Sequence, residues 1–147
     1  MRISVGADHA GFKLKEAVKA HLVAAGHEVK DFGTASDEST DYPDYGDPAA
    51  RAVARGDADL AVLVCGSGQG MCMVANKVRG VRGALAWHPD IARLSRQHND
   101  ANALCLPARF LGIEQALEIV DVWLGTGFEG GRHVRRVDKI MRTEREE

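Results

Sequence analysis

The chain has 147 residues, 45% of them hydrophobic, 27% charged and 5% aromatic, which suits one soluble domain, residues 1–147, with a sizeable core. The formal net charge of -2 argues against a nucleic-acid-binding protein, which normally carries a basic excess. The first residues, MRISVGADHAG, contain no apolar signal core, and no run approaches the ~20 apolar residues of a membrane span, so we expect a cytoplasmic protein with no membrane partner.

Segments typical of strands and helices alternate along the chain. Short runs rich in Val, Ile and Leu that end at Gly or Asp predict strands, and apolar residues at helical spacing, such as Leu14, Val18 and Leu22, predict helices. The uniformly hydrophobic run LAVLVCG is typical of a central strand that is covered on both faces. The expected strands are 2–8, 27–33, 60–66, 81–87 and 103–110, and the expected helices are 12–26, 43–55, 71–78, 89–98, 113–125 and 131–147.

This alternation predicts an α/β fold with three layers, α/β/α and Rossmann-like: a doubly wound, five-stranded parallel sheet with a C-terminal helical tail. Ligands of such folds bind at the carboxyl ends of the strands. The tail, 131–147, holds six Lys or Arg against four acidic residues, so it carries +2 and the rest of the chain -4. No strand follows the tail, and its narrow apolar stripe packs either on its own domain or on another subunit. The pattern leaves both possibilities open.

The three cysteines, Cys65, Cys72 and Cys105, are odd in number and form no CxxC pair. Without a secretory signal, this pattern indicates reduced thiols. No metal-ligand spacing occurs among the six histidines, so we expect no metal site. Any one of these cysteines could simply be a small buried apolar residue, and only its surroundings can indicate more.

The strongest local motif is the run 64–70, VCGSGQG, between the central strand and the next helix. Its three glycines allow a tight turn in which successive backbone N–H groups point into one space. A helix N-terminus behind such a loop makes a cradle for a phosphate or for a developing oxyanion. Cys65, at the tip of the strand, would face that cradle, where the positive environment favours the thiolate.

Other interpretations of this loop compete. A dinucleotide-binding fingerprint requires G-x-G-x-x-G after the first strand and an acidic residue about 20 residues later, whereas this loop is G-x-G-x-G. A nucleophile elbow requires G-x-C-x-G, but Leu63 and Val64 precede Cys65. A glycine-rich turn beside a merely structural cysteine also fits the pattern.

Two histidines strengthen the catalytic interpretation. His9 follows the first strand, in Asp8-His9-Ala10-Gly11, and His98 ends the helix after the fourth strand. Both are expected near the carboxyl edge of the sheet, where an imidazole could transfer the proton that opening of a sugar ring requires. Cys65 and the N–H cradle would then supply the base at carbon and the stabiliser of an enediolate. A lone histidine, however, is usually structural or merely exposed.

A phosphate group would need cations. Arg132 and Arg136 lie four residues apart, hence on one helical face, and their planar guanidinium groups suit phosphate oxygens. The same two arginines could instead belong to a basic helix face that only contacts solvent.

Five motifs, ADHAG, TDYPDY, VCGSGQGMCMVANK, LSRQHNDANAL and EGGRHVRRV, occur in this order between residues 7 and 137. In these motifs the sequence closely resembles the ribose-5-phosphate isomerase B family, within a wider group that includes galactose-6-phosphate isomerase subunits. The resemblance implies reversible interconversion of ribose 5-phosphate and ribulose 5-phosphate, a step of the pentose phosphate pathway, without metal or cofactor. It also implies a homodimer, sometimes paired into a dimer of dimers, in which each active site is completed by the neighbouring subunit.

The resemblance also implies residue roles. Cys65 would move the proton between C1 and C2, and His98 would open the furanose ring with Asp8 nearby. The backbone of the loop would hold the enediolate oxygen, with Ser67 where the family has Thr or Ser. The remaining expected substrate contacts are Asn99 with the hydroxyls, Tyr42 along the pocket, His9, Arg109, Arg132 and Arg136 with the phosphate, and Gly66, Ser67, Gly68, Gln69 and Gly70 in the loop.

Some members of this family lack the cysteine and use a glutamate a few residues later in the same loop. Met71 occupies that position and cannot accept a proton, so the chain resembles the cysteine type. Pro107 and Ala108 precede Arg109, where members of this family commonly have a Gly-Ser pair. This difference makes a phosphate-binding role less secure for Arg109 than for the other residues. Cys72 and Cys105 match no catalytic position and are expected to serve packing.

Two other functions stay open at this point. One is isomerisation of another aldose phosphate, such as allose 6-phosphate, galactose 6-phosphate or a tetrose phosphate, because the motifs set the length of the sugar only loosely. The other is a non-catalytic module that binds phosphate or nucleotide on the same sheet.

Overall fold

The computed structural model describes residues 1–145. Its five strands are β1 (Arg2–Ala7), β2 (Glu28–Asp31), β3 (Leu60–Cys65), β4 (Gly83–Leu85) and β5 (Ala103–Pro107). Its helices are α1 (Phe12–Ala24), α2 (Pro43–Ala54), α3 (Gln69–Lys77), α4 (Pro89–Asn99), α5 (Ile113–Leu124) and α6 (Arg132–Arg145), with a short 3-10 turn, η1 (Ala108–Phe110), after β5. The predicted alternation is confirmed, and the predicted tail ends in residues 146–147, outside the described part.

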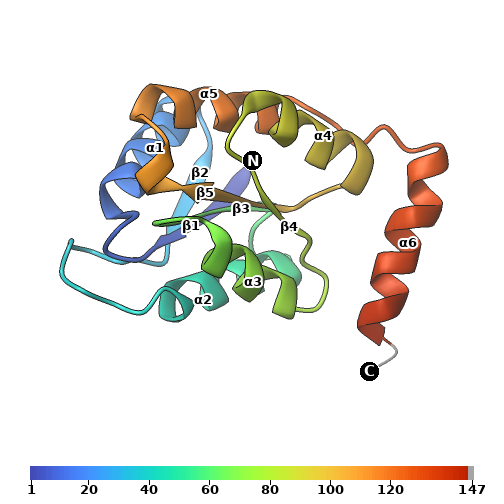
Figure 1. Ribbon diagram of the computed structural model, residues 1–147, viewed down its shortest axis with the longest axis horizontal. Coiled ribbons are helices and arrows are strands. Elements are labelled where there is room, and N and C mark those ends of the chain that lie inside the picture. The colour runs from blue at the N-terminus through green and yellow to red at the C-terminus, as the bar shows by residue number, and fades with distance from the viewer. Residues whose placement is uncertain (146–147) are drawn as a thin grey trace.

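The strands form one parallel sheet in the order β2-β1-β3-β5-β4. From β1 the chain moves to one side for β2 and then to the other side of β1 for β3, so the direction of winding reverses between β1 and β3. A doubly wound sheet opens a crevice at such a point, above the carboxyl ends of the two strands. Figure 1 shows α1, α4 and α5 on one face of the sheet and α2 and α3 on the other, which confirms the three predicted layers.

β3 lies at the centre, and all six of its residues are buried. Because side chains alternate along a strand, Leu60, Val62 and Val64 enter the core under α1 and α5. Ala61, Leu63 and Cys65 enter the second core, under α2 and α3. The last residue of β3 is therefore Cys65, at the carboxyl edge and on the α2/α3 side.

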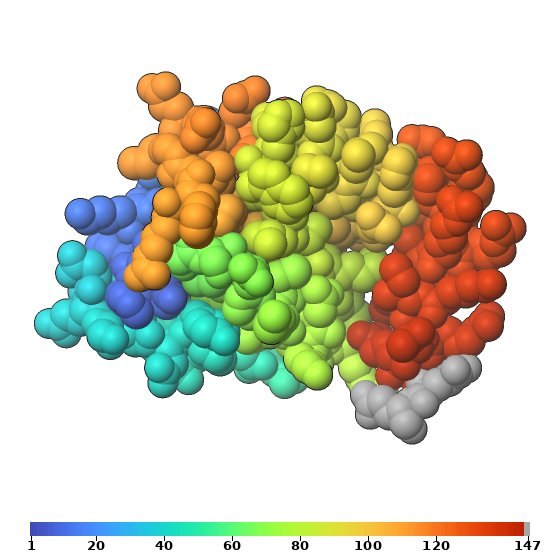
Figure 2. Space-filling model, in the orientation of Figure 1, coloured from blue at the N-terminus to red at the C-terminus, as the bar shows by residue number. Residues whose placement is uncertain are grey.

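α6 stands apart from the layers, at one end of the molecule (Figures 1 and 2). It touches the domain through buried His133 and Val137, and the Glu144 carboxylate accepts a hydrogen bond of 2.8 Å from the Gly80 N–H. Val134 and Ile140 remain 43% and 48% exposed. One side of α6 thus packs on its own domain and leaves part of the apolar stripe uncovered. No helix among residues 1–145 is long and apolar enough to cross a membrane.

The turn between β1 and α1 depends on close backbone approach. A Cβ atom on Gly11 would lie 2.6 Å from the carbonyl oxygen of Val64, nearer than real Cβ contacts come. The Gly11 N–H donates a 3.0 Å hydrogen bond to Asp8 Oδ1, so the same turn fixes the Asp8 carboxylate.

We expect Gly11→Ala to lower the free energy of unfolding by about 1–3 kcal/mol, because the added methyl forces α1 away from β3. Urea unfolding followed by circular dichroism measures this loss. Gly127→Ala is the matched control, since a Cβ there meets nothing within 4 Å. Equal stability of the two variants would contradict the packing argument.

Candidate active site

Most of the residues predicted from the sequence meet in one cavity at the carboxyl edge of β1 and β3. Its volume is about 610 Å³. Of the predicted residues, its wall contains Asp8, His9, Tyr42, Cys65, Gly66, Ser67, Gly70 and Arg109. They come from four separate parts of the chain, and the reversal of winding between β1 and β3 explains why these parts converge.

Asp8 and His9 follow β1 and are held by backbone groups. Asp8 is buried, and one of its carboxylate oxygens accepts the Gly11 N–H, which leaves the other oxygen for a ligand. Nδ1 of His9 lies 3.1 Å from the backbone nitrogen of Thr40 and 3.2 Å from its carbonyl oxygen. The Thr40 backbone therefore holds the ring in either tautomer, and His9 lines the cavity.

Cys65 and the glycine loop form the floor. Cys65 is 4% exposed, and the loop continues into the first turn of α3. The N-cap residue Gly68 supplies no side-chain cap there, and the Ser67 hydroxyl accepts a 3.4 Å hydrogen bond from the Gln69 N–H. Gly68 has a φ of +75°, a left-handed conformation that glycine adopts without steric cost. The turn thereby directs backbone N–H groups and the positive end of the α3 dipole toward the space beside Cys65.

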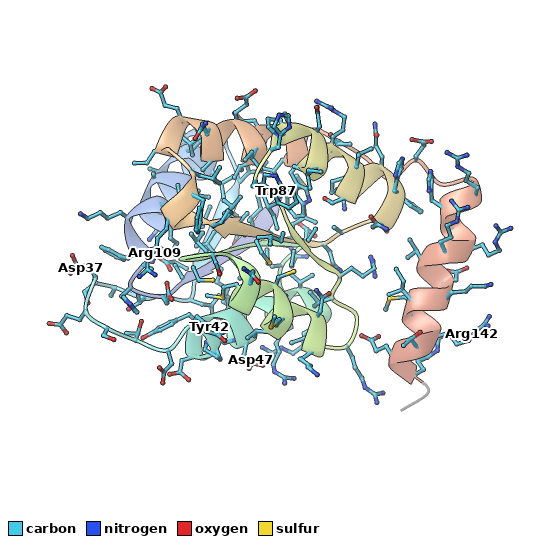
Figure 3. The ribbon with its side chains drawn as sticks, in the orientation of Figure 1. Asp37, Tyr42, Asp47, Trp87, Arg109 and Arg142 are labelled. Carbon is cyan, nitrogen blue, oxygen red and sulfur yellow. The ribbon has the colours of Figure 1, made fainter. Side chains whose placement is uncertain are left out.

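Arg109 and Tyr42 close over this loop. The Arg109 guanidinium lies against Gly66, where a Cβ atom would come within 3.2 Å of Nη1. The Tyr42 ring lies against Gly70, where a Cβ would come within 2.5 Å of the ring. Figure 3 shows both side chains at one end of the molecule and Arg142 of α6 at the other. Within residues 1–145, Arg109 is the only arginine that lines the cavity.

Two predicted loop residues contribute differently. Gly68 is buried beneath the turn. The exposed Gln69 side chain lines a neighbouring groove on the other side of α3, together with Cys72, Met73 and Leu85. These two residues can serve the cavity only through their backbone.

Four predicted residues lie elsewhere: His98, Asn99, Arg132 and Arg136. The expectation that His98 lies near the carboxyl edge is wrong for this chain. α4 runs antiparallel to the strands and ends at Asn99, just before β5 begins at Ala103, so its end lies at the amino edge of the sheet. Arg132 and Arg136 project from the first half of α6 and are exposed. Within one chain, the structure does not bring these four residues to Cys65.

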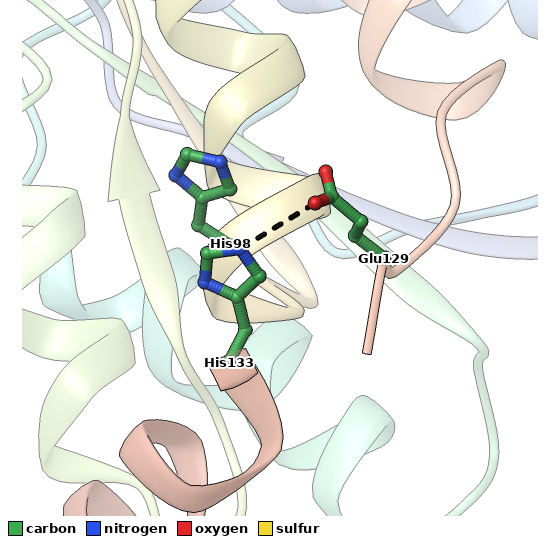
Figure 4. Close-up of side chains that lie close together, drawn as sticks. All are labelled: His98, Glu129 and His133. Atoms are coloured by element: carbon green, nitrogen blue, oxygen red, sulfur yellow. Dashed lines mark ion pairs between the residues drawn. The ribbon is translucent and has the colours of Figure 1, made fainter. Parts of the chain in front are cut away.

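Sequence reasoning missed Ala10, Met73 and Phe110, which also line the cavity. Met73 and Phe110 are large, apolar and 64% and 73% exposed, and in the sequence they are indistinguishable from core residues. It also missed His133, which is 4% exposed and stacks on His98 (Figure 4). Only the spacing of His133 and Val137 by four residues hinted that His133 faces inward.

Among residues 1–145, one group of histidine and acidic side chains has ligand atoms within 4.8 Å of one another: His98, Glu129 and His133. The two imidazole rings lie 13° from parallel with centroids 4.2 Å apart. Ring nitrogens bind a metal in the plane of the ring, and nearly parallel stacked rings do not aim at one point. This arrangement suits stacking better than chelation.

Comparison with known proteins places this geometry in a family. Residues 3–140 match the model of the Ribose/Galactose Isomerase family. The chain belongs to this family. It is 50% identical over 143 residues to ribose-5-phosphate isomerase B of Escherichia coli K12, covering 97% of this chain and 96% of that protein.

Solved structures of family members agree with the fold. A ribose-5-phosphate isomerase B from Clostridium thermocellum is 48% identical with a TM-score of 0.97, and the match covers 99% of this chain and 98% of the other. One from Mycoplasma genitalium, with bound ribulose-5-phosphate, is 44% identical with a TM-score of 0.95, covering 99% and 97%. The likeness therefore extends over the entire domain.

The two remaining cysteines of this family member share the α2/α3 core with Cys65. A hydrogen bond from the Cys105 thiol, more than any other contact, lowers the pKa of Cys72 to about 7 despite partial burial. The same hydrogen bond, together with burial, raises the pKa of Cys105 well above its usual value. Cys72 packs against the α2/α3 core, as the sequence indicated, and the lowered pKa makes it the more acidic of these two thiols.

We expect alkylation of Cys72 by iodoacetamide to accelerate about tenfold from about pH 6 to about pH 8 and then to level off, because only the thiolate reacts and its pKa is about 7. Mass spectrometry of peptides from timed samples measures the rate. Buried Cys105 is the internal control and should stay unmodified. A Cys72 rate that still rises above about pH 9 would contradict the lowered pKa.

Proposed function

We propose that this chain is an aldose–ketose isomerase that interconverts D-ribose 5-phosphate and D-ribulose 5-phosphate. The observation that supports this most is the position of Cys65, at the end of β3 and beside the free N–H groups of the loop that begins α3. The relatives described above are named for this activity, and the structure of one of them contains bound ribulose-5-phosphate.

The reaction needs a base at carbon and a stabiliser for negative charge. The Cys65 thiolate removes the proton from C2 of the open-chain aldose, and the electron pair forms an enediolate with charge on oxygen. Return of the proton to C1, with transfer of the hydroxyl proton from O2 to O1, completes the ketose. N–H groups of residues 66–70 and the positive end of the α3 dipole lower the energy of the enediolate. Ser67, half-buried in the same loop, can donate a hydrogen bond to a substrate oxygen.

Ring opening precedes this step, because ribose 5-phosphate is largely a cyclic hemiacetal. The C1–O4 bond breaks, O4 takes a proton from an acid and O1 gives its proton to a base. We assign the base to Asp8, whose second carboxylate oxygen is available in the cavity. We assign the acid to His98, which can reach the cavity only from another subunit.

The phosphate group needs cations and hydrogen-bonding groups at the mouth of the cavity. The Arg109 guanidinium and the His9 ring are already there. We propose that Arg132 and Arg136 join them from the partner subunit, along with His98 and Asn99, the latter binding sugar hydroxyls. Tyr42 would border the sugar.

A homodimer with shared active sites accounts for these assignments. Four of the proposed substrate-binding residues lie away from the cavity of their own chain, and α6 carries exposed Val134 and Ile140 beside its basic face. We propose that residues 1–147 form one domain whose tail, 131–147, packs on the partner. We propose further that the enzyme works in the cytoplasm, in the pentose phosphate pathway.

Isomerisation of a longer or shorter aldose phosphate is the nearest alternative, because the sequence motifs set the length of the sugar only loosely. Turnover numbers for five-carbon and six-carbon aldose phosphates distinguish these substrates. A non-catalytic phosphate-binding module is the alternative from another class, and it requires no thiol.

We expect Cys65→Ala to lower kcat by about 10²–10⁴, the usual contribution of a positioned base. Binding of ribulose 5-phosphate should persist, because the cradle and the cations remain. A coupled assay measures kcat, and calorimetry measures binding.

Cys72→Ala is the matched control, a cysteine of the same core, and should keep most of the activity. Unchanged turnover by Cys65→Ala would remove Cys65 from the mechanism. A wild-type protein that binds sugar phosphates without converting any would favour the binding module.

Shared sites predict complementation between two inactive variants. Cys65→Ala lacks the base, and the double variant Arg132→Ala/Arg136→Ala lacks the cations given to the partner. A mixed dimer has one intact site and one doubly defective site, so an equal mixture refolded together should recover about a quarter of wild-type activity.

Each variant refolded alone is the control. Native mass spectrometry verifies that mixed dimers have formed. Mixed dimers without activity would contradict the exchange of residues between subunits.

A further inference from the structure

His98, the proposed ring-opening acid, is packed face to face against another histidine. Its ring lies 4.2 Å from that of His133, at an angle of 13° (Figure 4). The two residues come from different helices, α4 and α6. His133 is one of the few α6 residues buried against the domain, and it lies directly behind His98.

Burial of His133 costs free energy, and stacking on His98 alone gives no reason for a histidine at this position. Among residues 1–145 the Nε2 of His133 has no hydrogen-bond partner, and the Glu129 carboxylate lies 3.7 Å from it. A buried polar atom without a hydrogen bond costs free energy. An aliphatic side chain would avoid this cost and fill the space, but it would not present a flat face to the His98 imidazole.

The surroundings disfavour a charge on His133. Burial lowers the pKa of His133 most, followed by the neighbouring His98, and Arg132 and Arg136 act in the same direction. Glu129 opposes them. His133 is also the more deeply buried of the two rings, and His98 is the more exposed.

The segment around Glu129 fixes the pair in place. The Glu129 N–H donates a 3.0 Å hydrogen bond to the carbonyl oxygen of Gln97, next to His98. The end of α4 and the start of α6 are thereby tied together through the backbone, and the histidine stack forms between them. Side-chain rotation of His98 is restricted on one face by this arrangement.

We propose that His133 is a positioning residue for ring opening, whose flat face sets the orientation of the His98 imidazole that protonates O4 of the substrate. This inference rests on the proposed function. His133 itself transfers no proton and acts only through His98. The carbon–carbon proton transfer by Cys65 does not depend on it.

Two assays on the intact protein separate these steps. Conversion of ribose 5-phosphate requires ring opening. Exchange of solvent deuterium into C1 of ribulose 5-phosphate does not, because this ketose has no free hydroxyl that can close a five-membered ring. The exchange therefore reports Cys65 and the cradle alone.

We expect His133→Ala to lower kcat for ribose 5-phosphate about tenfold or more, since a misplaced catalytic group loses up to about 10²-fold. KM and the deuterium-exchange rate should change little. His133→Phe keeps the flat face and should retain most of the activity, whereas His133→Gln should behave like His133→Ala. Circular dichroism verifies that each variant folds. If His133→Ala does not fold, comparison of His133→Phe with His133→Gln tests whether the flat ring is required.

Val137→Ala is the matched control, because Val137 is the other buried residue of α6, one turn further on. It loosens the helix without touching the stack, so it should affect both assays equally or not at all. Equal losses in both assays for His133→Ala, no loss in either, or a Phe variant as defective as the Gln variant would overturn the proposal.

The reference variant His98→Ala keeps this test distinct from the proposed function. If His98→Ala loses ring opening and His133→Ala does not, the positioning role alone fails. If His98→Ala converts ribose 5-phosphate normally, the assignment of the acid fails, and the role of His133 fails with it.

Discussion

Ala7 of β1 pairs with Val64 of β3, and the geometry of the cavity depends on this register. One residue beyond the pair, the two strands release Asp8 and Cys65 at the same edge of the sheet. The Asp8 N–H still donates to the Val64 carbonyl oxygen at 3.4 Å, so the loops begin to diverge only after these two side chains, the proposed bases of the reaction, are in place. A shift of one residue would turn Cys65 to the opposite face of the sheet, away from α3.

The core under α2 and α3 consists largely of small side chains, which suits a Cys65 that must lie close to α3. Ala49, Ala50, Ala61, Ala75 and Ala103 are all completely buried there. Small residues let α2 and α3 approach the sheet closely, and the glycine loop then reaches α3 without a long connection. The core on the other face contains the larger side chains, including Trp123 of α5, and provides more of the apolar burial that stabilises the domain.

Much of this arrangement could be predicted from the sequence, because the information is local. The uniform hydrophobicity of residues 60–64 indicated a central strand, and the glycines after Cys65 indicated a backbone cradle at its end. Element ends were less predictable: the strand expected at 81–87 is only Gly83–Leu85, since flanking apolar residues such as Ala86 are buried without belonging to the strand.

Long-range placement could not be predicted from local pattern. β5 lies between β3 and β4, which brings Arg109 over the glycine loop, and nothing in the sequence near Arg109 encodes that order. His98 was misplaced because the sequence gives the end of a helix but not the sheet edge to which the helix returns. The stack with His133 depends on the direction of α6, which only the tertiary structure defines.

The two outermost strands have a further consequence for association. β2 has four residues and β4 has three, and β2 exposes Glu28 and Lys30. Short, charged edge strands are poor templates for adding another strand. The short length of both edge strands therefore protects the sheet against open-ended growth by backbone pairing. The dimer proposed above would have to form through side-chain surfaces, which can close on themselves and stop.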